Sequence, residues 1–212
     1  MKAPAGQRDL YLLLSIWAAG LIWSGYAPFD RATWLLEVAP ALIAAIVLWA
    51  TRRRYTPTTL LMALVMVHGL ILMLGGKYTY AHVPLGFWMR DWFGWEHNNY
   101  DKLGHFAQGF VPAVAARELL LRVFGISSRR LLAFLVVAIC LGISAAYELI
   151  EWAVALLMGQ GADEFLGSQG NPWDTQEDMC MALIGAIAAL LSLSRWHDRQ
   201  IAARAGSAPA PK

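Results

Sequence analysis

Long apolar stretches separated by short polar segments run through almost the whole chain. Six of these stretches approach the ~20 residues that a helix needs to cross a bilayer. They span residues 10–24, 34–50, 58–74, 103–121, 131–157 and 179–194. The pattern predicts an all-α, polytopic integral membrane bundle of six transmembrane helices. An even number of spans places both termini on the same side of the membrane.

A shorter pattern lies in the connection between the third and fourth spans. Pro84 is followed by apolar residues at the spacing i, i+3, i+4, i+7 and i+8, which gathers them on one face of a helix. These residues are Leu85, Trp88, Met89, Trp92 and Phe93. The spacing predicts a short helix that lies in the membrane interface on the outer side.

Composition supports this interpretation and bounds the domain organisation. The chain is 58% hydrophobic and only 15% charged, whereas soluble domains carry about 25% charged residues. We expect a single six-helix membrane domain at residues 1–198 and a disordered cytoplasmic tail at 199–212, which ends in AGSAPAPK. The expected partner is the lipid bilayer. No feature indicates a nucleic-acid partner, and the oligomeric state is not defined by the sequence.

The distribution of basic residues predicts the orientation. Most of the 17 lysines and arginines lie at the termini and in the loops after the second and fourth spans. The opposite side carries only Arg31, Lys77, Arg90 and Lys102. Because cytoplasmic segments are enriched in basic residues, both termini are predicted to be cytoplasmic.

Two acidic residues in the fifth span are the strongest candidates for function. Glu148 and Glu151 share one helix face near the C-terminal end of the span, where the helix dipole disfavours negative charge. An ionised carboxylate inside a membrane costs several kcal/mol unless it is paired, protonated or bound to a cation. By contrast, Glu118 is expected to reach the membrane surface with its side chain.

Several polar residues of other spans lie at a similar depth. Asp101, His105 and Gln108 occupy one face of the fourth span, and Glu37 lies one turn into the second. We therefore expect a single acidic pocket that opens away from the cytoplasm. A lone buried histidine such as His68 is more often a core residue than a ligand.

Helix capping is a competing explanation for three of the acids. Asp101 follows two asparagines at a helix start, and the segment DTQED places Asp174 and Asp178 in capping-box patterns at the start of the sixth span. Capping does not explain Glu148 and Glu151.

The chemistry of these side chains suggests specific roles. Carboxylates with an imidazole suit Mg, Mn or Zn, and such a divalent metal ion can activate water. The candidate catalytic residues are Glu148, Glu151, His105 and Asp101, the candidate metal ligands are these four with Asp178, and the candidate substrate-binding residues are Glu37, Lys102, Gln108 and Asp174. A metal-free alternative uses a glutamate as a general acid or base. No diagnostic metal or hydrolase motif accompanies them.

Four longer segments carry a family resemblance: GKYTYAHVPLGFWMRDWFG, YDKLGHFAQGFVPA, AAYELIEW and DEFLGSQGNPWDTQEDM. Together they resemble the YjdF-type family of bacterial inner-membrane proteins, whose biochemical function is not established. This resemblance implies a multi-pass protein of the bacterial inner (plasma) membrane. The segment DKLGH is also similar to the VanZ-like membrane proteins, but their later motif has no clear copy here, so no catalytic role is carried over.

Three functions remain open from the sequence. The first is a one-sided acidic pocket that binds a cation or acts on a lipid or lipid-linked headgroup. The second is a proton- or cation-coupled transporter or channel for small solutes, and the third is a non-catalytic membrane scaffold. Transport usually requires polar residues on both sides of the midplane, whereas the inner halves of the last two spans are apolar. The first function is therefore favoured.

Overall fold

The computed structural model describes residues 5–158 and 168–205. Within them the chain forms seven helices and no strand, which confirms the all-α prediction. The helices are α1 (Ala5–Gly25), α2 (Arg31–Thr51), α3 (Thr59–Tyr78), α4 (Pro84–Phe93), α5 (Tyr100–Arg122), α6 (Arg129–Met158) and α8 (Asp174–Ala205). Each predicted span coincides with one long helix. The segment predicted to be a short helix forms α4.

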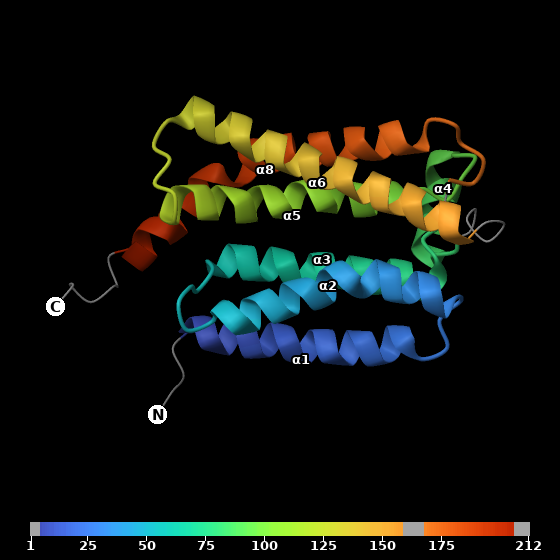
Figure 1. The fold of residues 1–212 in the computed structure, drawn as a ribbon, viewed down its shortest axis with the longest axis horizontal. Coiled ribbons are helices and arrows are strands. Elements are labelled where there is room, and N and C mark those ends of the chain that lie inside the picture. Colours follow the sequence, from blue (N-terminus) through green and yellow to red (C-terminus); the bar gives the residue numbers. More distant parts are fainter. Residues whose placement is uncertain (1–4, 159–167, 206–212) are drawn as a thin grey trace.

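The six long helices lie in two groups of three that run side by side (Figure 1). Helices α1, α2 and α3 pack together, as do α5, α6 and α8, and the two groups meet mainly along α3 and α5. Helix α4 lies at one end of the bundle, whereas α1 begins and α8 ends at the other (Figure 1). We call these the α4 end and the terminal end.

Four helices have the character of membrane spans. By length and composition, α2, α3, α6 and α8 are apolar enough to cross a membrane. Helix α5 lies among them (Figure 1) but carries charged residues in its first and last turns, including Asp101 and Arg122.

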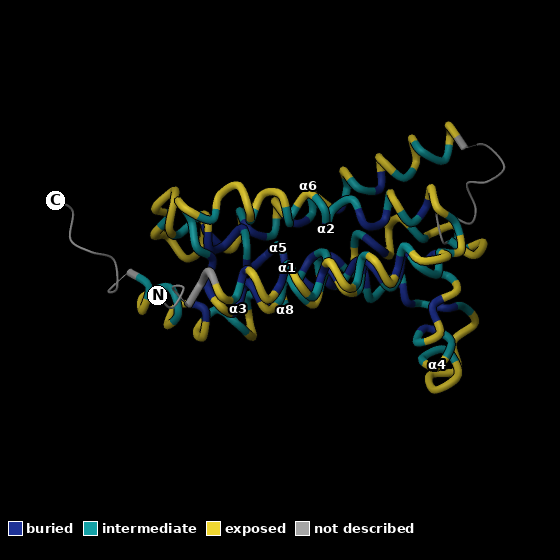
Figure 2. Tube along the Cα trace, turned by 90° about the horizontal axis from the view of Figure 1, so that it is seen from below, coloured by how far each residue is buried: buried dark blue, intermediate teal, exposed yellow. Residues whose placement is uncertain are grey.

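The outward faces of the bundle are strongly apolar. Exposed residues line the outer sides of the helices while buried residues lie between them (Figure 2). Large apolar side chains on these outward faces include Ile22, Ile46, Phe134, Leu157 and Leu191. A soluble monomer rarely exposes so much contiguous apolar surface, so this surface fits contact with lipid.

Helix α8 is longer than the sequence predicted. Residues 199–205, which were assigned to the disordered tail, continue the helix. The Leu60 backbone N–H donates to Gln200 Oε1 at 2.9 Å within this extension, and Arg117 pairs with Asp198 at 2.6 Å directly before it. Helix α8 therefore continues seven residues beyond the predicted domain boundary at residue 198. Residues 206–212 lie outside the described residues.

Two glycines allow α5 and α8 to pack closely. A Cβ atom on Gly109 would overlap the backbone carbonyl of Ala182, and one on Gly185 would overlap the backbone of Phe106. Small residues of this kind let membrane helices approach each other at the backbone. This contact fixes the rotation of α5 and α8, and with it the direction of their polar side chains.

The α4 segment has clear start and stop signals. Pro84 occupies the first turn, where its missing N–H has no cost, and Gly94 ends the helix at φ 68°. Gly86 is the buried residue of α4, and it packs against the Asn98 side chain. Trp88, Trp92 and Phe93 of the predicted apolar stripe are exposed, whereas Leu85 packs against the bundle beside Tyr80 and Tyr100, so most of the stripe points away from the bundle.

The Asp30 side chain caps α2, and its removal has a predictable cost. Asp30 accepts a hydrogen bond from the Thr33 backbone N–H at 2.7 Å, and this bond lowers the pKa of the Asp30 carboxyl. Asp30→Ala is expected to destabilise the protein by about 1 kcal/mol near neutral pH. A carboxyl whose pKa is lowered on folding stabilises the fold above its unfolded pKa of about 4. The difference between variant and wild type should therefore shrink as pH falls through the lower folded-state pKa.

Thermal melts of detergent-purified protein at neutral and acidic pH would measure this difference. Asp91→Asn, which alters an exposed acid in α4, is the matched control and should change little. A cost that stayed constant down to acidic pH would contradict the capping role.

Candidate functional site

One cavity lies between the two groups of helices. It has a volume of about 150 Å³ and is walled by α2, α3, α5, α6 and Tyr80, which follows α3. Its charged, imidazole and amide residues are Glu37, His68, Asp101, His105, Gln108 and Glu151. The structure thus places five of the residues selected from the sequence around one space. That space is large enough for several water molecules or a small polar group.

His105 makes the largest set of polar contacts at this cavity. Its Nδ1 lies 3.0 Å from Gln108 Oε1 and 3.8 Å from Glu148 Oε1. Its Nε2 lies 3.4 Å from Asp101 Oδ1 and 3.8 Å from Asp178 Oδ2. Because an amide oxygen only accepts, Nδ1 donates to Gln108, and Nε2 is the nitrogen that faces the two aspartates.

Lys102 binds the acidic start of α8. Its Nζ lies 2.7 Å from Asp174 Oδ1, 2.9 Å from Asp178 Oδ1 and 3.4 Å from Glu177 Oε2. The carboxylates of Asp174 and Asp178 are therefore engaged across the α5–α8 contact, so capping is not their main role. Asp178 is 2% exposed. Its Oδ1 pairs with Lys102, and its Oδ2 faces His105.

Three of the five expected metal ligands come together. One ligand atom each from Asp101, His105 and Asp178 lies within 4.8 Å of the others. Two carboxylates and one imidazole form a donor set that suits Mg, Mn or Zn. The structure does not bring Glu148 or Glu151 into this group: Glu148 faces the opposite nitrogen of His105, and Glu151 lines the cavity.

A second, narrow polar pocket lies beside the same residues at the α4 end. It has a volume of about 10 Å³, and its lining includes His97, Asn99, Lys102 and Asp174. Asp101 lines both this pocket and the larger cavity. A space of this size admits about one water molecule.

Tyr80 is a cavity residue that the sequence analysis did not select. Thr79 and Tyr80 both have positive φ, at 55° and 37°, a conformation that is uncommon for residues other than glycine. Gly75 and Gly104 leave room for the Tyr80 ring, because a Cβ on either would meet it. Two strained residues and two glycines thus place one phenol beside Glu37.

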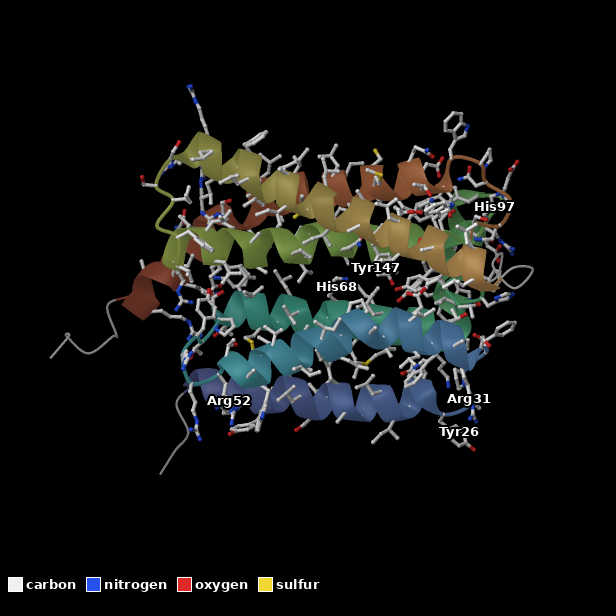
Figure 3. The ribbon with its side chains drawn as sticks, in the orientation of Figure 1. Tyr26, Arg31, Arg52, His68, His97 and Tyr147 are labelled. Atoms are coloured by element: carbon white, nitrogen blue, oxygen red, sulfur yellow. The ribbon has the colours of Figure 1, made fainter. Side chains whose placement is uncertain are left out.

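Tyr147 and His68 complete the polar lining, and both extend between the two helix groups (Figure 3). The Tyr147 hydroxyl donates to Glu37 Oε2 at 3.3 Å. Four buried side-chain atoms have no hydrogen-bond partner among the described residues, and two of them, His68 Nε2 and Glu148 Oε1, belong to residues at or beside this cavity. The position of Tyr147 directly before Glu148 is a sequence signal that could have identified it. The sequence favours a core role for His68, but the structure places it in the cavity lining.

Glu118 is not a surface side chain, which corrects the sequence analysis. It is 0% exposed and belongs to a second polar network at the terminal end. Its carboxylate accepts hydrogen bonds from Tyr55, Thr58 and His197 and pairs with Arg122. The reason is that α5 turns this residue toward α3 and α8 and not toward the lipid.

Comparisons with known proteins give one family and one curated relative. Residues 10–199 match the family described as "Predicted membrane protein (DUF2238)". The chain is 54% identical to the inner membrane protein YjdF of Escherichia coli strain K12 over 181 residues, which cover 85% of this chain and 87% of that protein. No solved structure matches the chain.

Proposed function

The chain belongs to the DUF2238 family of membrane proteins, and we propose that it binds a divalent metal ion at Asp101, His105 and Asp178. The observation that carries this proposal is the approach of these three ligand atoms to within 4.8 Å of one another. The resemblance found in the sequence is confirmed by the family match. The proposed location is the bacterial inner membrane, as in the relative's name.

In the proposed topology all six long helices cross the bilayer and both termini are cytoplasmic. The basic residues support it: Arg52 lies at the terminal end, where most arginines are found, and Arg31 is one of the few at the α4 end (Figure 3). The exposed tryptophans of α4 support an interfacial position on the outer side. In this topology Asp101, His105 and Asp178 lie in the outer half of the membrane.

The contacts around His105 favour metal ligation through one nitrogen. Gln108 accepts the Nδ1 proton, so Nε2, which faces Asp101 and Asp178, is the nitrogen that would bind the ion once it has released its own proton. An outer hydrogen bond of this kind orients a ligating histidine and increases its basicity. Lys102 occupies Oδ1 of Asp178, so Oδ2 remains for an ion.

A metal ion at this position would supply Lewis-acid chemistry beside the cavity, either by activating water or by polarising a bound headgroup. Transport across the membrane is less well supported. A cluster of fully buried apolar residues, among them Ala113, Val136 and Cys140, lies between the cavity and the Glu118 network. A purely structural role is also less well supported, because Glu148 Oε1 has no hydrogen-bond partner among the described residues.

Elemental analysis of detergent-purified protein tests the metal proposal. Protein equilibrated with Mg, Mn or Zn and then freed of excess ion should retain about one ion per chain. His105→Ala and Asp178→Asn should each lower this content at least about tenfold, as expected for loss of a direct ligand.

Glu177→Gln is the matched control, since Glu177 also faces Lys102 but is half-exposed and lies outside the group of three. It should keep the metal. Wild-type protein that holds none of the three ions, or variants with unchanged content and an intact fold, would refute the proposal.

A further inference from the structure

We infer that the cavity receives the ammonium head of a membrane lipid, which enters sideways between α2 and α6. The inference rests on the membrane placement proposed above and does not require the metal ion. Four features of the cavity support it: where it opens, what lines its mouth, what charge it carries and which polar atom is unpaired.

The cavity opens on the side where α2 and α6 face each other. Its walls include Glu37 and Pro40 from α2 and Ile143 and Tyr147 from α6. The two helix groups are joined mainly through α3 and α5 on the other side, and the last turns of α6 stand away from the other helices (Figure 2). Ile143 is 42% exposed although it lines the cavity, so the cavity reaches the outer surface there.

The lining combines apolar and polar residues, and the helices beside the opening carry apolar side chains. Pro40, Leu72, Pro112 and Ile143 supply apolar lining, and Ile43 and Ile139 are exposed on the adjoining faces of α2 and α6. A molecule that enters this way passes from hydrocarbon to carboxylates within one space. This gradient matches an amphiphile whose chains stay in the bilayer while its head enters the protein.

The acidic residues of the cavity favour a cationic lipid head. Glu37, Asp101 and Glu151 line the cavity, and His105 is the partner of Asp101. Glu37 and Glu151 therefore remain as acids without a lysine or arginine among the cavity-lining residues. A compact ammonium group with three N–H donors satisfies both carboxylates, whereas an anionic head would be repelled at low dielectric.

Other polar atoms in or beside the cavity lack a usual partner. His68 Nε2 is buried in the lining without a hydrogen-bond partner among the described residues. Pro40 and Pro112 have no N–H, so the carbonyls of Leu36 and Gln108 lack their usual helical donor. A primary ammonium head could donate to these carbonyl oxygens, which the prolines leave without a helical N–H.

The test is lipid binding by the purified full chain, measured by native mass spectrometry with added phosphatidylethanolamine or phosphatidylglycerol. Wild type should retain the ethanolamine lipid at least about tenfold more strongly, because charge-assisted hydrogen bonds are the stronger kind. The paired change Glu37→Gln and Glu151→Gln should remove this preference. Equal retention of the two lipids by wild type would overturn the inference.

Three further arms separate the alternatives. Ile143→Trp narrows the exposed mouth without touching a carboxylate and should reduce lipid retention; unchanged retention would contradict sideways entry. Free ethanolamine that displaced the lipid at equal concentration would identify a soluble amine as the ligand and overturn the lipid assignment. Asp178→Asn should lose metal and keep the lipid preference, so that failure of one proposal is distinguishable from failure of the other.

Discussion

Replacing Glu118 by alanine is expected to lower the free energy of unfolding by about 3–5 kcal/mol, as does removal of one partner of a buried ion pair. The carboxylate is fully buried and serves several donors at once. Thr58 donates through its backbone N–H at 3.0 Å and its hydroxyl at 2.7 Å, and Arg122 pairs with it. Alanine would leave both Thr58 donors without this acceptor, and Arg122 would keep only the Thr56 carbonyl.

His197 links the Glu118 network to Arg117. Its Nε2 lies 2.9 Å from Glu118 Oε2 and its Nδ1 lies 3.1 Å from Arg117 Nη1. Arginine only donates, so Nδ1 accepts and the proton of neutral His197 sits on Nε2, where it donates to Glu118. The network therefore ties α5 to α8 and to the start of α3.

Unfolding in mixed micelles or thermal melts would measure the effect of Glu118→Ala. For a chain of this size the melting temperature should fall by about 10 °C. Glu118→Gln keeps the shape and should cost less than alanine. Asp91→Asn is the control, because both side chains of the Arg90–Asp91 pair are exposed, at 36% and 63%, and exposed ion pairs contribute about 0–1 kcal/mol. An alanine variant within about 1 kcal/mol of wild type would show that the network is not needed for stability.

Gly109→Ala is expected to cost about 3 kcal/mol or more, at the upper end of the usual penalty for overpacking. The added methyl group would overlap the backbone carbonyl of Ala182. Backbone cannot move aside as the end of a flexible side chain can, so α5 and α8 would have to separate. Separation would also pull Lys102 away from Asp174 and Asp178, and metal content should fall together with stability.

Gly142→Ala is the matched control for this effect. Gly142 lies in α6, and a Cβ there would meet no atom within 4 Å. Alanine should be neutral or stabilise the helix by up to about 1 kcal/mol, since glycine is a poor helix former. Equal melting temperatures for the Gly109 and Gly142 variants would contradict the close packing of α5 and α8.

The helices were predictable because their signals are local. Span length and apolar spacing depend on a few consecutive turns, and these located every long helix and the short α4 segment. The end of α8 was missed because a long-range contact decides it: the Gln200 side chain binds the backbone of Leu60, and no local pattern in residues 199–205 reveals that partner.

The sequence also indicated which residue types would gather, because acids and a histidine on one face of an apolar helix are costly in lipid. It determined that Asp101, His105 and Gln108 share a face. Only the tertiary structure decided which groups meet: Lys102 binds acids about 70 positions away in α8, and Glu118 is buried and not exposed. Such pairings depend on the rotation of each helix about its axis, which the contact at Gly109 and Gly185 fixes and no single helix encodes.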